Sequence, residues 1–230
     1  TQELNDGDWT DAILARWEDA EKKQLSEDTP EATPDIEEED IKRFHREYVS
    51  LQKLKHPNIV QVYNSGTHGE YPWISMEFIE GSDLSELIEE WKAYSEADFS
   101  QIKDILAKIC SAIEYIHQQG MIHRDLKPSN VLITKDNQPK ITDFGGVKAP
   151  STFHSELTTM GKLVGTVAFM APEHILGETL DKRADLYSLG ALLYMCLTGK
   201  KPFEAQNIAG YLSLHLTTPP PNPQTSNPSV

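Results

Sequence analysis

The feature that most constrains the fold of this chain is a polar stretch, His-Arg-Asp-Leu-Lys-Pro-Ser-Asn at 123–130, set between apolar segments. Before it, isoleucines recur at three- and four-residue spacing from Ile102 to Ile116, which predicts a helix with one buried face. After it, the β-branched segments 131–133 and 140–142 are separated by a polar turn, which predicts a β-hairpin. A polar loop held between a buried helix and a hairpin is a place where proteins present reactive groups.

Two tripeptides follow this stretch in an order and at separations typical of one family. Asp143-Phe144-Gly145 ends the second hairpin strand, and Ala171-Pro172-Glu173 lies further along the chain. Together with the polar stretch, they resemble the signature of eukaryotic-type protein kinases, in the bacterial serine/threonine branch. The resemblance extends over roughly residues 37–220 and implies an α+β, two-lobed kinase fold with an incomplete small N-lobe and a mainly helical C-lobe.

The resemblance and the composition together divide the chain into four segments. We expect an acidic N-terminal segment at 1–36 that the family pattern does not assign, a partial N-lobe of one helix and two strands at 37–79, a C-lobe with the catalytic and activation loops at 80–216, and a proline-rich, extended tail at 217–230. The family's last two C-lobe helices have no counterpart in this sequence.

Local patterns predict the elements within these segments. The predicted set is a helix over 37–54, strands at 59–63 and 73–78 joined by a turn at 66–72, a short helix capped by Asp83 and ending near Trp91, a long helix opening at Ser95, and a helix over 186–197. The last is apolar on nearly all sides, which predicts that it is buried. Asp185 at its start is expected to cap it and to hold the backbone of the catalytic loop.

The resemblance assigns chemical roles to five polar residues. Asp125 would accept the proton of a substrate hydroxyl, and Lys127 would stabilise charge on the γ-phosphate of ATP. Asn130 and Asp143 carry hard oxygen ligands that suit Mg²⁺. Thr166 matches the threonine that helps serine/threonine kinases to shape the site for the protein substrate. His123 is more plausible as a core residue than as a catalytic one, since a histidine on an apolar interface usually belongs to the core.

A nucleotide site is implied by the same resemblance. Met76 would be the gatekeeper, and Leu132 would form the floor of the adenine slot. The Glu77 carbonyl and the Ile79 amide would contact adenine, and Asp83 the ribose. Without the resemblance, Met76 and Leu132 would be ordinary core residues.

The N-terminal part departs from the family. Gly7 is the only glycine before Gly66, so a glycine-rich phosphate loop is absent from this sequence, and no Val-Ala-X-Lys pattern supplies the third-strand lysine. Glu47 matches the helix glutamate that normally pairs with that lysine. Its usual partner is therefore missing.

Composition limits the classes of partner. The formal net charge is −15, and residues 1–40 contribute 15 acidic and 3 basic side chains, so the remainder is nearly balanced and no basic face indicates nucleic acid. No apolar run is long enough to span a membrane, and a cytoplasmic location is expected. Cys110 and Cys196 lie in apolar helical patterns and are expected to be buried free thiols.

Three hypotheses for function remain open. The first is transfer of the ATP γ-phosphate to Ser or Thr hydroxyls of protein substrates, with Mg²⁺. The second is a pseudokinase or docking module, because the glycine-rich loop and the third-strand lysine are absent. The third is an inactive fragment of an active kinase.

Overall fold

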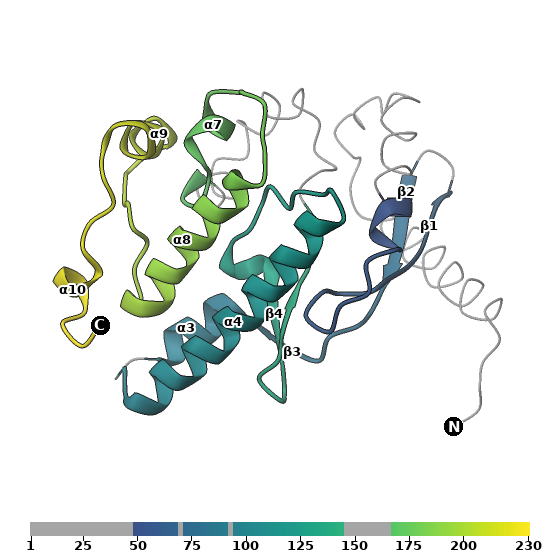
Figure 1. The fold of residues 1–230 in the computed structure, drawn as a ribbon, viewed down its shortest axis with the longest axis horizontal. Coiled ribbons are helices and arrows are strands. Elements are labelled where there is room, and N and C mark those ends of the chain that lie inside the picture. The colour runs from purple at the N-terminus through teal and green to yellow at the C-terminus, as the bar shows by residue number, and fades with distance from the viewer. Residues whose placement is uncertain (1–47, 69–70, 92–93, 145–166) are drawn as a thin grey trace, which may run out of the picture. The chain divides into compact units, whose positions relative to one another are not determined.

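The computed structural model of this chain describes residues 48–68, 71–91, 94–144 and 167–230. All of these belong to the second of two units into which the chain divides, Glu38–Val230. Figure 1 shows their helices and strands. No helix among the described residues is both long and apolar enough to cross a bilayer.

The first sheet is an antiparallel hairpin of β1 (Val62–His68) and β2 (Tyr71–Met76). The predicted strand at 59–63 and turn at 66–72 are wrong in their bounds, because β1 begins at Val62 and continues through Gly66 to His68. Gly66 faces Trp73 across the pair, and a Cβ on this glycine would lie 2.6 Å from the Trp73 ring. The glycine therefore admits a large ring above a strand and does not mark a turn.

Two helices begin where the sequence predicts. α3 (Leu84–Glu90) is capped by Asp83, whose Oδ1 accepts hydrogen bonds from the amides of Ser85 and Glu86 at 2.8 and 3.2 Å. α4 (Glu96–Gln118) opens with a capping box, in which Ser95 and Asp98 satisfy each other's backbone amides. The isoleucine face of α4 is buried, as its spacing predicts.

The second sheet holds the predicted hairpin. β4 (Val131–Thr134) pairs with β5 (Pro139–Ile141) on one side and with the short β3 (Gly81–Asp83) on the other, all antiparallel. Its buried residues and those of α4 form one hydrophobic core with parts of α3 and α8. Figure 1 shows α4 beside β3 and β4, and the polar stretch connects α4 to β4.

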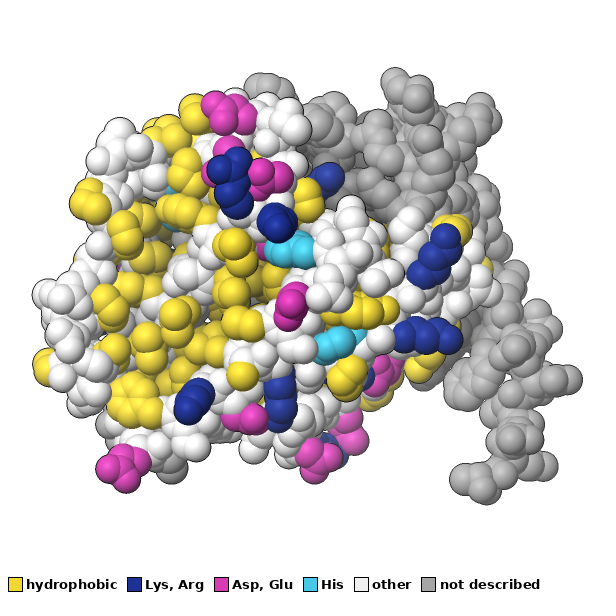
Figure 2. Space-filling model, in the orientation of Figure 1, with side chains coloured by type: hydrophobic (Ala, Val, Ile, Leu, Met, Phe, Trp, Pro, Cys, Tyr) yellow, Lys and Arg dark blue, Asp and Glu magenta, His cyan; other side chains and the backbone are white. Residues whose placement is uncertain are grey.

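Helix α8 (Arg183–Thr198) extends beyond the predicted 186–197 and ends at Gly199, which takes a left-handed conformation with φ of 68°. The predicted burial of this helix is confirmed on one side only, because Leu186 and Leu193 are 52% and 41% exposed. Figure 2 shows hydrophobic side chains gathered over α8. Cys196 on this helix is buried as predicted, whereas Cys110 on α4 is exposed.

The remaining elements are short. α7 (Pro172–Ile175) and α9 (Ile208–Thr217) pack together and against a second apolar cluster around Phe169. The tail is not simply extended, because α10 (Pro223–Ser226) forms a helical turn and the Asn227 amide donates to the Leu197 carbonyl at 2.7 Å. This bond fixes the tail against the end of α8.

Candidate active site

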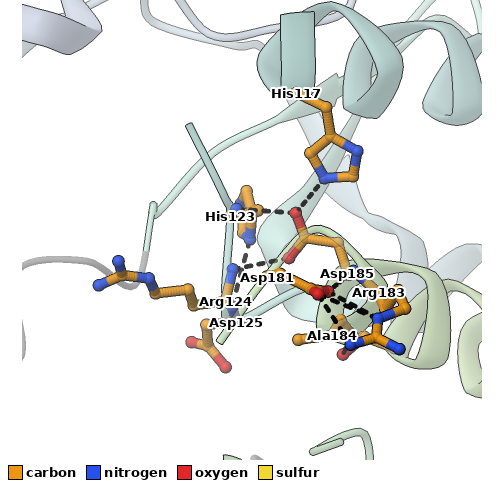
Figure 3. A network of polar contacts seen from close by, with 9 residues as sticks. His117, His123, Arg124, Asp125, Asp181, Arg183, Ala184 and Asp185 are labelled. Carbon is orange, nitrogen blue, oxygen red and sulfur yellow. Dashed lines mark hydrogen bonds and ion pairs between the residues drawn. The ribbon is translucent and has the colours of Figure 1, made fainter. Parts of the chain in front are cut away.

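The backbone of the polar loop is held by one buried carboxylate from α8. Asp185 is fully buried and accepts hydrogen bonds from the backbone amides of His123 at 2.9 Å and Arg124 at 2.8 Å. His117, in the last turn of α4, lies 2.7 Å from the same carboxylate through Nε2. Figure 3 shows that these contacts converge from α4, α8 and the loop. Asp185 therefore fixes the loop as predicted, but Lys182 and not Asp185 occupies the N-cap of α8.

This anchoring offsets an unfavourable backbone conformation. Arg124 has a φ of 69°, in the left-handed region that non-glycine residues rarely adopt. Such a conformation persists only where neighbouring contacts over-determine it. The bond from the Arg124 amide to Asp185 is one such contact, and it orients the next residue, Asp125.

His123 is a core residue, which agrees with its predicted structural role. Its side chain has no exposed surface, its Nε2 lies 3.1 Å from the Thr142 carbonyl, and its ring centroid is 4.9 Å from that of Phe144. Because the carbonyl only accepts, Nε2 must carry the proton, and Nδ1 can then accept from the Asp125 amide at 3.4 Å. Burial lowers the pKa of His123, which favours this neutral form.

Three of the predicted catalytic residues are brought together in the loop. The ammonium of Lys127 lies 2.8 Å from Oδ2 of Asp125. The side-chain amide of Asn130 donates to the backbone carbonyl of Asp125 at 2.8 Å and to Oδ2 of Asp125 at 3.1 Å. Asn130 is buried, whereas Asp125 and Lys127 are partly exposed. A carboxylate oriented by an ammonium and an amide can accept a proton from a hydroxyl that approaches from the exposed side.

Asp143 is linked to the same cluster through the backbone. The Thr142 amide donates to the Asn130 carbonyl at 3.0 Å, so the residue before Asp143 lies against Asn130. Asp143 itself is exposed and has a φ of 54°. Within the described ranges no group of three or more His, Cys, Asp and Glu side chains is placed to hold a metal ion. The amide oxygen of Asn130 and the Asp143 carboxylate are nevertheless hard ligands that fit Mg²⁺, which commonly takes few protein ligands and keeps several waters.

The predicted nucleotide residues lie at the end of β2, on the segment after it, on β3 and on β4. The Glu77 amide donates to the Gln61 carbonyl at 2.8 Å, which leaves the Glu77 carbonyl as the second backbone polar group of this residue. Across the described residues, neither this carbonyl nor the Ile79 amide is used in a hydrogen bond. Asp83 pairs with the half-buried Leu132 in the sheet.

Other features of this segment bear on the predicted roles. Met76 is 37% exposed at the end of β2. The Asp83 carboxylate is engaged as the cap of α3 through Oδ1, which a ribose contact would have to share. Glu47, Thr166 and the rest of segment 145–166 lie outside the described residues.

Two contributors to the site were not predicted from the sequence. His117 reaches Asp185 across 68 positions, and Lys140 pairs with Glu77 across 63. No local sequence pattern marks either residue. His117 lies in the last turn of the amphipathic helix α4, and Lys140 lies on the half-exposed side of β5. Only the tertiary packing brings them to the site.

The fold should lose stability at acidic pH. Because burial lowers the pKa of folded His123 below its ordinary 6.5, the unfolded chain takes up the proton first. This stabilisation is complete above that value and is lost as the pH falls toward the folded-state pKa, at no more than about 1.4 kcal/mol per pH unit. We expect the midpoint of urea unfolding to decrease from about pH 7.5 to about 5.5, and to decrease less in His123→Phe.

Part of this pH dependence should remain in the variant. Burial also lowers the pKa of His174 and of His215, so the slope should be reduced and not abolished. A wild-type midpoint that stays constant over this range would contradict the expectation. So would an unchanged slope in His123→Phe.

Comparisons with known proteins bear directly on this site. The family model of the protein kinase domain matches residues 22–221. This match begins 15 residues before residue 37, where the resemblance in the sequence motifs starts. Serine/threonine-protein kinase Pkn1 of Myxococcus xanthus is 37% identical over 194 residues, covering 83% of this chain and 27% of that protein. PrkC of Bacillus subtilis is 36% identical over 190 residues, covering 83% of this chain and 28% of that protein.

A solved structure gives the same result. The PknI kinase domain of Mycobacterium tuberculosis aligns with a TM-score of 0.61 and 25% identity, over 84% of this chain and 66% of that one. The predicted α+β kinase fold is thus confirmed. The chain spans less than a third of the length of the curated relatives named above. Protein kinases in general use ATP with a divalent metal ion and act on protein substrates. This chain belongs to the protein kinase family.

Proposed function

We propose that this chain transfers the γ-phosphate of ATP to Ser or Thr hydroxyls of protein substrates. The observation that carries the proposal is the cluster of Asp125, Lys127 and Asn130, in which one carboxylate oxygen is contacted by both an ammonium and an amide. Phosphoryl transfer depends mainly on positioning and charge neutralisation, and this cluster supplies groups for both.

Each residue has a distinct task in the proposed reaction. Asp125 orients the attacking hydroxyl and accepts its proton, and Lys127, which pairs with Asp125, would neutralise charge on a phosphate oxygen. Asn130 and Asp143 would hold Mg²⁺, which supplies positive charge to the phosphate groups when bound. The lysine two residues after Asp125, with Thr166, favours Ser and Thr over Tyr as acceptors. Glu47 remains without an assigned lysine partner in the sequence.

The nucleotide would lie between the segment after β2 and the sheet of β3 and β4. The Glu77 carbonyl and the Ile79 amide offer one acceptor and one donor to adenine, with Met76 and Leu132 as apolar contacts. The Asp83 carboxylate would contact the ribose while it caps α3.

A second candidate function is a non-catalytic kinase-like docking module. The observation that favours it is the lack of a glycine-rich stretch in the N-terminal part of this sequence, where Gly7 is the only glycine before Gly66. A chain without the phosphate loop and the third-strand lysine would hold nucleotide with fewer contacts, or would hold none.

Nucleotide binding separates the two candidates. At about a hundred times its dissociation constant, MgATP should stabilise the native chain by about 2.7 kcal/mol, which raises the thermal midpoint by several degrees. We expect this shift to require Mg²⁺, to disappear in Asp143→Ala and to persist in Asp136→Ala, which removes an exposed acid from the turn of the same hairpin. A wild-type chain that unfolds cooperatively and shows no shift would favour the docking module.

A further inference from the structure

The segment proposed to face adenine is fixed by the side chain of Glu77. Its carboxylate lies 2.7 Å from the Lys140 ammonium through each oxygen and accepts the Gln61 amide on Oε2 at 3.2 Å. The Glu77 amide in turn donates to the Gln61 carbonyl at 2.8 Å. Three groups, two from the Gln61 backbone and one from Lys140, therefore hold Glu77, whose carbonyl is the proposed adenine contact.

Lys140 connects this segment to the other end of the proposed site. It lies on β5, three residues before Asp143 and directly after Pro139, whose carbonyl accepts from the buried Asn58 amide at 2.8 Å. β5 is thus a fixed strand whose continuation carries the proposed metal ligand. The Lys140–Glu77 pair joins the adenine-facing backbone to that strand through side chains, beside the backbone bond from the Val60 amide to the Ile141 carbonyl.

We infer that Lys140 and Glu77 are positioning residues for the nucleotide, which keep the adenine-facing backbone at a fixed separation from Asp143. The inference rests on the proposed function and extends it to two side chains that touch neither metal nor phosphate. An ion pair that fixes two parts of a site gives affinity by preorganisation, because less freedom is lost when the ligand binds.

A second ion pair in the same region provides a matched comparison. Lys135 and Glu80 also join the β4–β5 hairpin to the segment after β2, but their side chains are 68% and 69% exposed. Those of Lys140 and Glu77 are 17% and 27% exposed. Exposed pairs are screened by water and contribute little, whereas loss of one partner from a partly buried pair leaves a charge without compensation.

The experiment measures MgATP affinity by calorimetry for the wild-type chain and four variants. We expect Lys140→Met and Glu77→Gln to bind MgATP about tenfold more weakly, since each removes the ion pair. Lys140→Arg should stay within about twofold of the wild type, because it keeps a cation at the same place. Lys135→Met should also bind like the wild type.

Kinetics distinguish positioning from general damage. In Lys140→Met we expect the KM for ATP to rise about tenfold with little change in the KM for a peptide substrate. If Lys140→Met and Glu77→Gln both bind MgATP as well as the wild type, the inference is overturned. Equal losses of ATP and peptide affinity together with a lower thermal midpoint would also overturn it, in favour of a purely structural pair.

The variants are chosen so that one unstable protein does not end the test. Should Lys140→Met fail to fold, Glu77→Gln still reports, because its amide oxygen can accept from Gln61 in place of the carboxylate. Failure of the proposed function is seen separately, as a wild-type chain that binds no MgATP. A wild-type chain that binds MgATP, together with Lys140→Met and Glu77→Gln variants of unchanged affinity, would refute the inference and leave the proposed function standing.

Discussion

The Asp125→Asn variant should transfer phosphate to protein about 10²- to 10⁴-fold more slowly than the wild type, the range typical for loss of a general base. Asparagine keeps the size of the side chain, and its amide oxygen can still accept from Lys127 or Asn130. It cannot take up the proton of a substrate hydroxyl. The loss should therefore fall on the chemical step, and the fold should remain intact.

Incorporation of labelled phosphate at saturating ATP and substrate measures this effect. MgATP affinity should change little, because in our proposal Asn130 and Asp143 hold the metal and Asp125 does not. Asp104→Asn serves as the control, since it removes an exposed acid that pairs with Lys108 one turn along α4. Equal incorporation by the Asp125→Asn and wild-type chains would show that the observed transfer does not use this carboxylate.

Replacement of Asp185 by alanine should lower the free energy of unfolding by about 3–5 kcal/mol, as for a buried charge network that loses one member. The carboxylate is fully buried and accepts from two loop amides and contacts His117, so its removal leaves several buried donors without an acceptor. Because one of those amides belongs to Arg124, phosphate transfer should fall as well.

Urea unfolding of the wild-type and Asp185→Ala chains gives the difference directly. Asp185→Asn should be intermediate, because it keeps one oxygen acceptor but turns an amide toward the loop donors. Asp181→Ala is the matched control, since Asp181 precedes the same helix and bonds the exposed Arg183. An alanine variant as stable as the wild type would mean that the loop amides find other acceptors.

Much of the C-terminal fold could be predicted because its signals are local. The isoleucine spacing of α4, the capping residues Ser95 and Asp83, and the polar turn between β4 and β5 each act within a few residues. The proximity of Asp125, Lys127 and Asn130 has a related reason, since these residues lie within six positions of one another. Their roles came from the family resemblance, which local patterns alone do not supply.

The errors arise where one residue type serves two purposes. A glycine favours turns, but it also admits a ring above a strand, and only the paired Trp73 shows that Gly66 does the second. Cys110 follows the buried Ile109 by one position, and about 100° of helical rotation is enough to expose it. Contacts such as Lys140 with Glu77 depend on chain packing over 63 positions, which no periodicity records.

The apolar surface over α8 affects how this chain is handled. Leu186 and Leu193 lie seven positions apart on one side of the helix, and side chains of this size in water invite self-association at high concentration. Dyes that fluoresce on binding hydrophobic surfaces would already bind the native state and give high fluorescence before unfolding begins. Intrinsic tryptophan emission, to which the buried Trp91 contributes as one of four tryptophans, records melting without such a dye. Dilute samples and mild detergent are then sensible first conditions.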